Sequence, residues 1–282
     1  MNKEDQYKTL LEFEKKWHKP IWEFMAHKMA NREEPPPEKP IKEPVFRPRY
    51  ARKGAKPDAN NALNKIKQVT DELVDLEFLD ISEDACVFTQ LLAEQYKVKK
   101  ITCVSRASNK HAYLNAPILS LVELDLTGDQ QYEELAKLGP FDVIVLKEVL
   151  HQIHNLDAFF EVVRSILKPE GIIFAVWRPQ APPLPVPNVA METWRKLMPL
   201  RDDVIASADA AGLKIDAYAA SIPIVTHRDD WAKILLSNCL PAISQCAKCT
   251  PAAVADFISK KPTEMKFEER IFIFVFWQPD DA

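Results

Sequence analysis

Four side chains that can bind a ligand or react occupy every second position from residue 80 to residue 86, at the end of an expected buried strand. They are Asp80, Ser82, Asp84 and Cys86, within FLDISEDACVFTQLLAEQY, residues 78–96, a stretch without glycine. Where a buried strand turns into a helix, glycines let backbone N–H groups approach an anionic ligand. Side chains occupy those positions here. Ser82 or Asp84 would instead cap the helix from within, because Ser and Asp are preferred capping residues.

The composition supports this interpretation. The 282-residue chain contains five glycines and 22 prolines, where average usage gives about 20 and 14. Loops that hold phosphate groups need glycine, so the shortage counts against a nucleotide site. The 37 basic and 41 acidic residues give a net charge of −4, which argues against a general nucleic-acid binder.

Two other groups of residues have the chemistry of metal ligands. His151 and His154 are three residues apart, as they would be on one helix face, but no acidic or thiol partner follows at helical spacing. Cys246 and Cys249 form a C-x-x-C pair with Cys239 nearby, yet a zinc site needs a second pair. We therefore expect no metal site, and a metal or redox role for the cysteines is the minor alternative.

The segment EEPPPEKPIKEPVFRPRYARKGAKP, residues 33–57, combines proline with charge and cannot form a regular element. Its basic residues surround Tyr50: Arg47, Arg49, Arg52, Lys53 and Lys56. They form either a solvated linker or a strip that binds RNA. The linker is favoured, because no second basic block supports RNA binding.

The chain divides into three expected parts. Apolar spacing over residues 4–31 predicts two short helices, with Pro20 in the first turn of the second. Trp17 and Trp22 lie on their apolar faces, so these helices should dock on the domain or on a partner. The parts are a helical extension (1–34), a Pro-rich basic linker (35–60) and a domain (61–282).

Within the domain, strands alternate with helices. Helical spacing covers residues 61–74, 86–96 and 155–168. Strands are expected at 76–81, 99–105, 117–126, 141–150 and 171–177, followed by two long ones at 213–224 and 268–277. This alternation predicts an α/β fold with a Rossmann-like, doubly wound, seven-stranded and mostly parallel sheet. The last strand, near Arg270 to Trp277, should be antiparallel.

The stretch GPFDVIVLKEVLHQIHNLDAFFEVVRSILKPEGIIFAVW, residues 139–177, resembles part of the class I S-adenosylmethionine-dependent methyltransferases, especially those that act on small molecules. It is similar to their fourth strand, the following helix and the Leu-Lys-Pro-Gly-Gly turn before the fifth strand. The matching residues are Arg164, Leu167, Lys168, Pro169 and Gly171, with Glu170 in place of the first glycine. The resemblance covers roughly residues 61–277.

The resemblance implies S-adenosylmethionine as cofactor and places its first motif at residues 80–86. Asp80 matches the acid of that motif, but Ser82, Asp84 and Cys86 stand where the family has three glycines. Asp84 would also bring negative charge beside the carboxylate of the cofactor. Two such charges 4 Å apart repel by about 1 kcal/mol in water and about 4 kcal/mol at an effective dielectric of 20.

The other implied contacts lie at the ends of three further strands. Ser105 stands where the family has an acid that holds both ribose hydroxyls. Asp125 matches the acid that contacts adenine, or is a strand-end cap. Lys147 takes a position that faces the cofactor and could fill that space or pair with Asp80, Asp84 or Glu148. No catalytic base can be chosen.

These residues favour a non-catalytic protein with a methyltransferase fold that acts through protein–protein contacts. The contacts would involve the N-terminal helices or the Pro-rich segments, of which residues 179–187 border the substrate entrance in active relatives. The alternatives are an active small-molecule methyltransferase with a remodelled cofactor turn and an RNA-associated factor that uses the basic linker. The longest apolar run, residues 271–277, is too short for a membrane span. Five cysteines suggest a reducing compartment, so the cytoplasm or the nucleus is expected.

Overall fold

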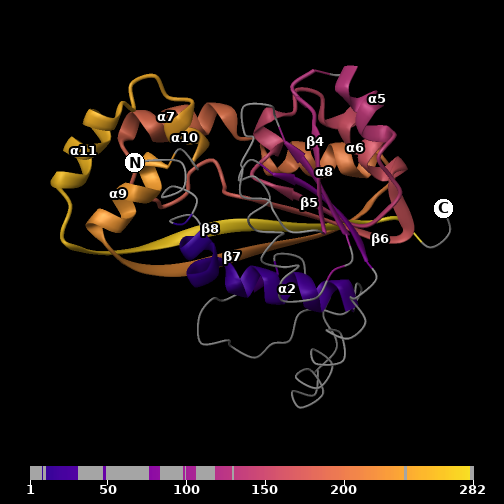
Figure 1. Cartoon of the computed structure of the whole chain (residues 1–282), viewed down its shortest axis with the longest axis horizontal. Helices are drawn as coiled ribbons and strands as arrows, with labels where there is room; N and C mark the ends of the chain where they lie inside the picture. Colours follow the sequence, from indigo (N-terminus) through magenta and orange to yellow (C-terminus); the bar gives the residue numbers. More distant parts are fainter. Residues whose placement is uncertain are drawn as a thin grey trace, which may run out of the picture.

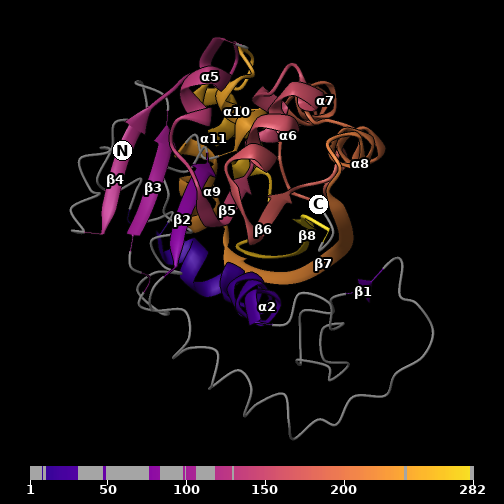
Figure 2. The ribbon, with the colours of Figure 1, turned by 90° about the vertical axis from the view of Figure 1, so that its right-hand side faces the viewer.

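The computed structural model describes residues 8, 11–30, 47–48, 76–82, 98, 100–105, 118–128, 130–237 and 240–279. Within these residues eight strands form one sheet in the order β1-β7-β8-β6-β5-β2-β3-β4, which can be followed from right to left in Figure 2. Seven of them make the predicted seven-stranded sheet. The eighth, β1 (Arg47–Pro48), adds two residues at the edge of β7 and corrects the expectation that residues 33–57 contain no regular element.

The seven longer strands are mostly buried in the middle of the sheet and more exposed at its β4 edge. They are β2 (Glu77–Ser82), β3 (Lys100–Ser105), β4 (Leu119–Glu123), β5 (Phe141–Lys147), β6 (Leu167–Trp177), β7 (Lys214–His227) and β8 (Glu264–Trp277). The first five of these run parallel to one another. β8 is antiparallel to both β6 and β7. The predicted direction of the last strand is therefore confirmed.

Helices cover both faces of the sheet, as Figure 1 shows. One face carries α5 (Gln130–Ala136), α6 (Leu156–Ser165) and α8 (Arg201–Ala210). The other carries α2 (Lys19–Ala30), which lies across β7 and β8. Among the described residues, no helix is both long and apolar enough to cross a bilayer.

Helix α6 shows how the sequence pattern becomes packing. The Asn155 side chain accepts a hydrogen bond from the Ala158 N–H and so caps the first turn. Phe159, Phe160 and Val163 have no exposed surface, as their predicted apolar stripe requires. The Phe160 ring lies 5.3 Å from the ring of Phe276 in β8. Fully burying a side chain of this size contributes about 1.5–3 kcal/mol.

The N-terminal segment packs on the opposite face. Instead of the two predicted short helices, residues 11–30 form one continuous helical stretch, with a π-helical turn at Glu14–His18 before α2. Such turns occur mostly as single insertions in α-helices, often at functional sites. Ile21 and Met25 are fully buried. The Phe24 ring lies 4.8 Å from the ring of Tyr218 in β7.

A group of helices lies beside the sheet at one end of β7 and β8 (Figure 1). It consists of α7 (Asn188–Leu197), α9 (Arg228–Leu236), α10 (Pro241–Ser244) and α11 (Pro251–Ser259). The Pro-rich segment 179–187 runs along this group. Trp194 donates to the Pro179 carbonyl at 2.8 Å, and Trp231 donates to the Pro185 carbonyl at 2.8 Å.

The turn before the fifth predicted strand is part of β6. β6 pairs with β5 at Leu167 and again from Ile172, so the residues between them are displaced from the ladder. A Cβ on Gly171 would lie 2.6 Å from Leu167 Cδ1, closer than real Cβ contacts allow. The second glycine of the Leu-Lys-Pro-Gly-Gly turn is therefore needed for packing, and position 170 tolerates the exposed Glu.

Candidate functional site

The carboxyl ends of the parallel strands meet along one edge of the sheet, where open α/β sheets bind ligands. Ser82, the last residue of β2, is the register partner of Lys147, the last residue of β5. Ser105 ends β3 opposite Glu123 of β4. The fold therefore brings the predicted positions 82, 105 and 147 to the same edge.

Lys147 forms an ion pair across this edge with the N-terminal segment. Its Nζ donates to Glu14 Oε1 at 2.6 Å, and the two side chains are 6 % and 2 % exposed. The sequence analysis names Asp80, Asp84 and Glu148 as possible partners. The structure adds Glu14 to these, a residue 133 positions earlier in the chain.

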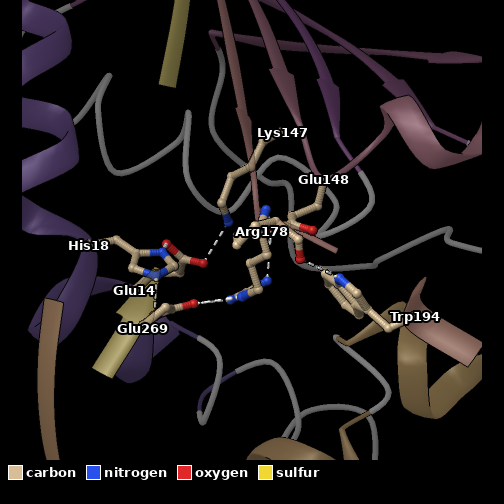
Figure 3. A network of polar contacts seen from close by, with 8 residues as sticks. Glu14, His18, Lys147, Glu148, Arg178, Trp194 and Glu269 are labelled. Atoms are coloured by element: carbon tan, nitrogen blue, oxygen red, sulfur yellow. Dashed lines mark hydrogen bonds and ion pairs between the residues drawn. The ribbon is translucent and has the colours of Figure 1, made fainter. Parts of the chain in front are cut away.

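Glu14 continues the network to β8 through His18. His18 Nδ1 lies 2.6 Å from Glu14 Oε2, and His18 Nε2 lies 3.0 Å from Glu269 Oε2. The spacing of Glu14 and His18 places both side chains on one side of the helical segment. All three side chains are buried, and Figure 3 shows them converging with Lys147.

Arg178 closes the network on the side of β6. It follows the last residue of β6, and its Nε donates to Glu269 Oε1 at 2.7 Å. Its Nη1 lies 3.1 Å from Glu148 Oε1, and its backbone N–H donates to the same oxygen at 3.0 Å. Glu148 has a φ of 52°, a left-handed conformation that is unusual for a residue other than glycine. That backbone turns the Glu148 side chain toward Arg178 (Figure 3).

The electrostatics of the network follow from burial and pairing. Burial alone would raise the pKa of Glu14, but His18 and Lys147 outweigh it and lower this pKa to about 2. Burial of Glu269 is likewise outweighed by Arg178 and His18, which lower its pKa to about 2. Burial would lower the pKa of His18, but the two carboxylates raise it to about 9. His18 is therefore protonated at neutral pH and donates from both ring nitrogens.

Glu148 differs from the other two carboxylates. Burial raises its pKa, and the charges of Arg178 and Lys147 only partly oppose this. With Glu148 ionised, the three carboxylates balance the three cations Lys147, His18 and Arg178. The arrangement is a buried, nearly neutral chain of charges that joins the N-terminal segment to three strands.

The remaining predicted positions are distributed as follows. Asp80 lies two residues before the end of β2 and is fully buried. Asp125 follows β4 and accepts hydrogen bonds from the Thr127 N–H at 3.2 Å and the Thr127 hydroxyl at 2.9 Å. This is the local turn contact expected of a strand-end cap. Asp84 and Cys86 lie outside the described residues.

The histidine pair does not share a helix face, which corrects the predicted geometry. His151 lies in a 3-10 turn (Leu150–Gln152), and Ile153 returns to extended angles of φ −89° and ψ 113°. The chain therefore leaves the helical conformation before His154. Within the part of the chain that the structure describes, no group of three or more His, Cys, Asp or Glu side chains could hold a metal.

Sequence reasoning missed four members of the network: Glu14, His18, Arg178 and Glu269. The spacing of Glu14 and His18 was visible, but a pair four residues apart is common on any helix. Glu269 carried only a weak signal, because it stands between the exposed Glu268 and Arg270, although alternation along the strand places it on the same face as the buried Ile271. Its partners come from distant parts of the chain and could not be read from local patterns.

Comparison with known proteins agrees with this architecture. Residues 79–175 match the family model of a methyltransferase domain. The central part of the chain is a methyltransferase-like domain. The match covers β2 to most of β6 and includes both Asp80 and Lys147.

Solved structures share the fold at low sequence identity. A methyltransferase of an antibiotic biosynthesis pathway from Anabaena variabilis is 10 % identical with a TM-score of 0.52, over 77 % of this chain and 97 % of that one. A methyltransferase from Bacillus halodurans is 14 % identical with a TM-score of 0.47, over 77 % and 98 %. An N-methyltransferase of Haemonchus contortus, solved with phosphomonomethylethanolamine and S-adenosylhomocysteine, is 14 % identical with a TM-score of 0.44, over 78 % and 53 %. No curated protein matches the chain significantly.

Proposed function

We propose that this methyltransferase-like domain does not transfer methyl groups and instead acts through contacts with a protein partner. One observation carries the proposal. Lys147, at the position that faces the cofactor in the family, donates at 2.6 Å to Glu14 of the same chain, and both side chains are buried. The protein uses internally a side chain that an active relative would turn toward its ligand.

The energy of the network supports this proposal. A ligand that draws Lys147 away from Glu14 removes one of the two cations, Lys147 and His18, that pair with this buried carboxylate. Removing one partner of a buried ion pair costs about 3–5 kcal/mol. Since each 1.4 kcal/mol is a factor of about ten in affinity, this penalty weakens binding by roughly a hundredfold or more.

The first motif adds a second line of support. Ser82 is buried at the register position beside Lys147, where a glycine would leave room for a ligand. The sequence also lacks glycine at positions 84 and 86. The residues therefore do not fit the family contacts for S-adenosylmethionine, and no step of a methyl transfer is assigned to them.

Binding of S-adenosylmethionine tests the proposal directly. A ligand at 100 times its dissociation constant stabilises a protein by about 2.7 kcal/mol. Each kcal/mol moves the melting temperature of a domain of this size by roughly 2–4 °C. At 1 mM S-adenosylmethionine we expect no reproducible shift and a dissociation constant no better than millimolar by calorimetry. A micromolar constant would favour the alternative, an active small-molecule methyltransferase with a remodelled turn.

A series of variants identifies which residues prevent S-adenosylmethionine from binding at the carboxyl edge of the sheet. Replacing residues 82, 84 and 86 by glycine together should restore binding only in part, because Ser105 still lacks the acid that holds the ribose. Adding Ser105→Asp should increase affinity further. If this fourfold variant folds but still fails to bind, adding Glu14→Gln tests whether the ion pair to Lys147 is the remaining obstacle. Binding by that variant alone would assign the block to the N-terminal segment.

A further inference from the structure

The turn Cys246–Cys249 lies between α10 and α11 and packs against α7. The Cys249 N–H donates to the Cys246 carbonyl at 2.8 Å, which closes a four-residue turn. The first and last Cα atoms of such a turn are less than about 7 Å apart. A disulfide needs Cα atoms about 4.4–6.8 Å apart, so a turn of this kind brings the two cysteines into the range in which a disulfide can form.

The sulfur atoms of Cys246 and Cys249 lie close together, just below the protein surface. Ala247 and Lys248 at the tip of the turn are exposed, and each cysteine retains 9 % of its surface. The Cys249 thiol hydrogen-bonds to the Cys246 sulfur. Cys246 Sγ also lies 3.8 Å from the carbonyl oxygen of Val189 in α7. The pair is reduced in this structure and its thiols already face each other.

The surroundings of the two thiols differ. Burial would raise the pKa of Cys246, but polar contacts with the Thr193 side chain, the Cys249 thiol and the backbone N–H groups of Lys248 and Cys249 lower it. Burial and the neighbouring Cys246 raise the pKa of Cys249 to about 12. The thiolate is the reactive form of cysteine, so these surroundings favour Cys246 over Cys249 as the attacking group.

We propose that Cys246 and Cys249 form a dithiol that exchanges with disulfides. The Cys246 thiolate attacks one sulfur of a substrate disulfide, forms a mixed disulfide and releases the first thiolate. Cys249 then loses its proton to solvent and attacks the Cys246 sulfur, which releases the second thiolate. The protein loses two electrons and two protons, and the substrate disulfide becomes two thiols.

A zinc site is the competing use of such a pair. Zinc in structural sites takes four ligands, usually Cys and His. Within the described residues no third ligand lies close enough to the two sulfurs to form a metal group. The dithiol is therefore the chemistry that the described neighbourhood supports.

Oxidised glutathione, a small disulfide, provides the test on the folded, reduced full-length protein. Trypsin cleaves after Lys248, between the two cysteines, so a Cys246–Cys249 disulfide joins two tryptic peptides that are otherwise separate. We expect this linked pair to form in the wild-type protein without stable addition of glutathione. A lasting glutathione adduct on Cys246, or no change while denatured protein reacts, would overturn the proposal.

Variants of each cysteine distinguish the attacking residue, Cys246, from the residue that resolves the mixed disulfide, Cys249. Cys249→Ser should accumulate glutathione on Cys246, whereas Cys246→Ser should react at Cys249 at least about tenfold more slowly, because that thiol is protonated. Cys103, fully buried in β3, provides the control, and Cys103→Ser should leave the exchange rate unchanged. If a variant does not fold, alkylation rates in the wild-type protein decide instead. Equal rates at Cys246 and Cys249, or retention of added zinc that prevents exchange, would contradict the assignment.

Discussion

The two ends of the carboxyl edge of the sheet hold their charged side chains in different ways. At the end formed by β5, β6 and β8, Lys147 bonds to Glu14, and Glu269 bonds to His18, across more than a hundred residues of sequence. At the end formed by β4, Asp125 accepts hydrogen bonds from Thr127, two residues away. The first set is buried and the second is exposed.

This difference indicates which charged contacts the fold requires and which can be lost at little cost in stability. Buried charges that lose their partner destabilise a protein strongly, whereas exposed pairs contribute little. The network therefore fixes the N-terminal segment against the sheet. The β4 end, by contrast, has a local contact that any cap residue could replace. The two ends should respond very differently to mutation.

The largest expected effect is at Arg178. Arg178→Met removes the cation that bonds both Glu148 and Glu269, while its stem can still cover the neighbouring apolar surface. We expect the free energy of unfolding to fall by about 3–5 kcal/mol, the cost of a broken buried pair. Urea denaturation of both proteins measures this difference.

Arg201 is the matched control. It pairs at 2.7 Å with Asp202, whose side chain is 78 % exposed. Arg201→Met should cost no more than about 1 kcal/mol, as exposed ion pairs do. Equal losses for the two variants would show that the network does not stabilise the fold more than a surface pair does.

The pH dependence of stability should come next in size. The pKa of His18 is raised from 6.5 to about 9, so its contribution is complete below pH 6.5 and is lost as the pH rises toward 9. Glu14 and Glu269, lowered from 4.5 to about 2, contribute above pH 4.5 and lose this contribution as the pH falls toward 2. The network is therefore fully effective between about pH 4.5 and 6.5.

The variant His18→Gln isolates the contribution of His18 to stability. Other titrating groups are present in both proteins, so their contributions cancel when the two free energies of unfolding are subtracted. The raised pKa corresponds to about 3 kcal/mol, and the stability advantage of the wild-type protein should shrink by this amount between pH 6.5 and 9. Denaturation curves at several pH values measure it. A pH-independent difference for His18→Gln would contradict the ionic role of His18.

The sheet could be predicted from the sequence because its signals are local. Alternating helices and buried strands indicated the parallel order, and the long apolar runs before Trp277 indicated the antiparallel pair at the end. The stripe of α6 was also visible, since Phe159, Phe160 and Val163 are large and regularly spaced. Each of these features depends on residues within one or two turns of one another.

The remaining features could not be predicted, since they depend on tertiary packing rather than on local sequence patterns. Helix α8 buries Val204, Ser207 and Ala208, which are too small to give a clear apolar pattern. The partner of Lys147 depends on where the N-terminal segment docks, and no local pattern indicates that Glu14 faces it. His151 and His154 had helical spacing, but the chain returns to an extended conformation at Ile153.

The smallest expected effect is at Asp125, and it tests the exposed end of the comparison. Asp125→Ala removes two hydrogen bonds to Thr127 at 3.2 and 2.9 Å, both exposed to solvent. Water can replace them, so the loss should be no more than about 1 kcal/mol. Asp125→Asn retains an acceptor for both bonds and should restore most of this loss. If Asp125→Ala instead costs as much as Arg178→Met, the β4 end is also structural. Asp125 would then be required for folding, whether or not a cofactor binds there.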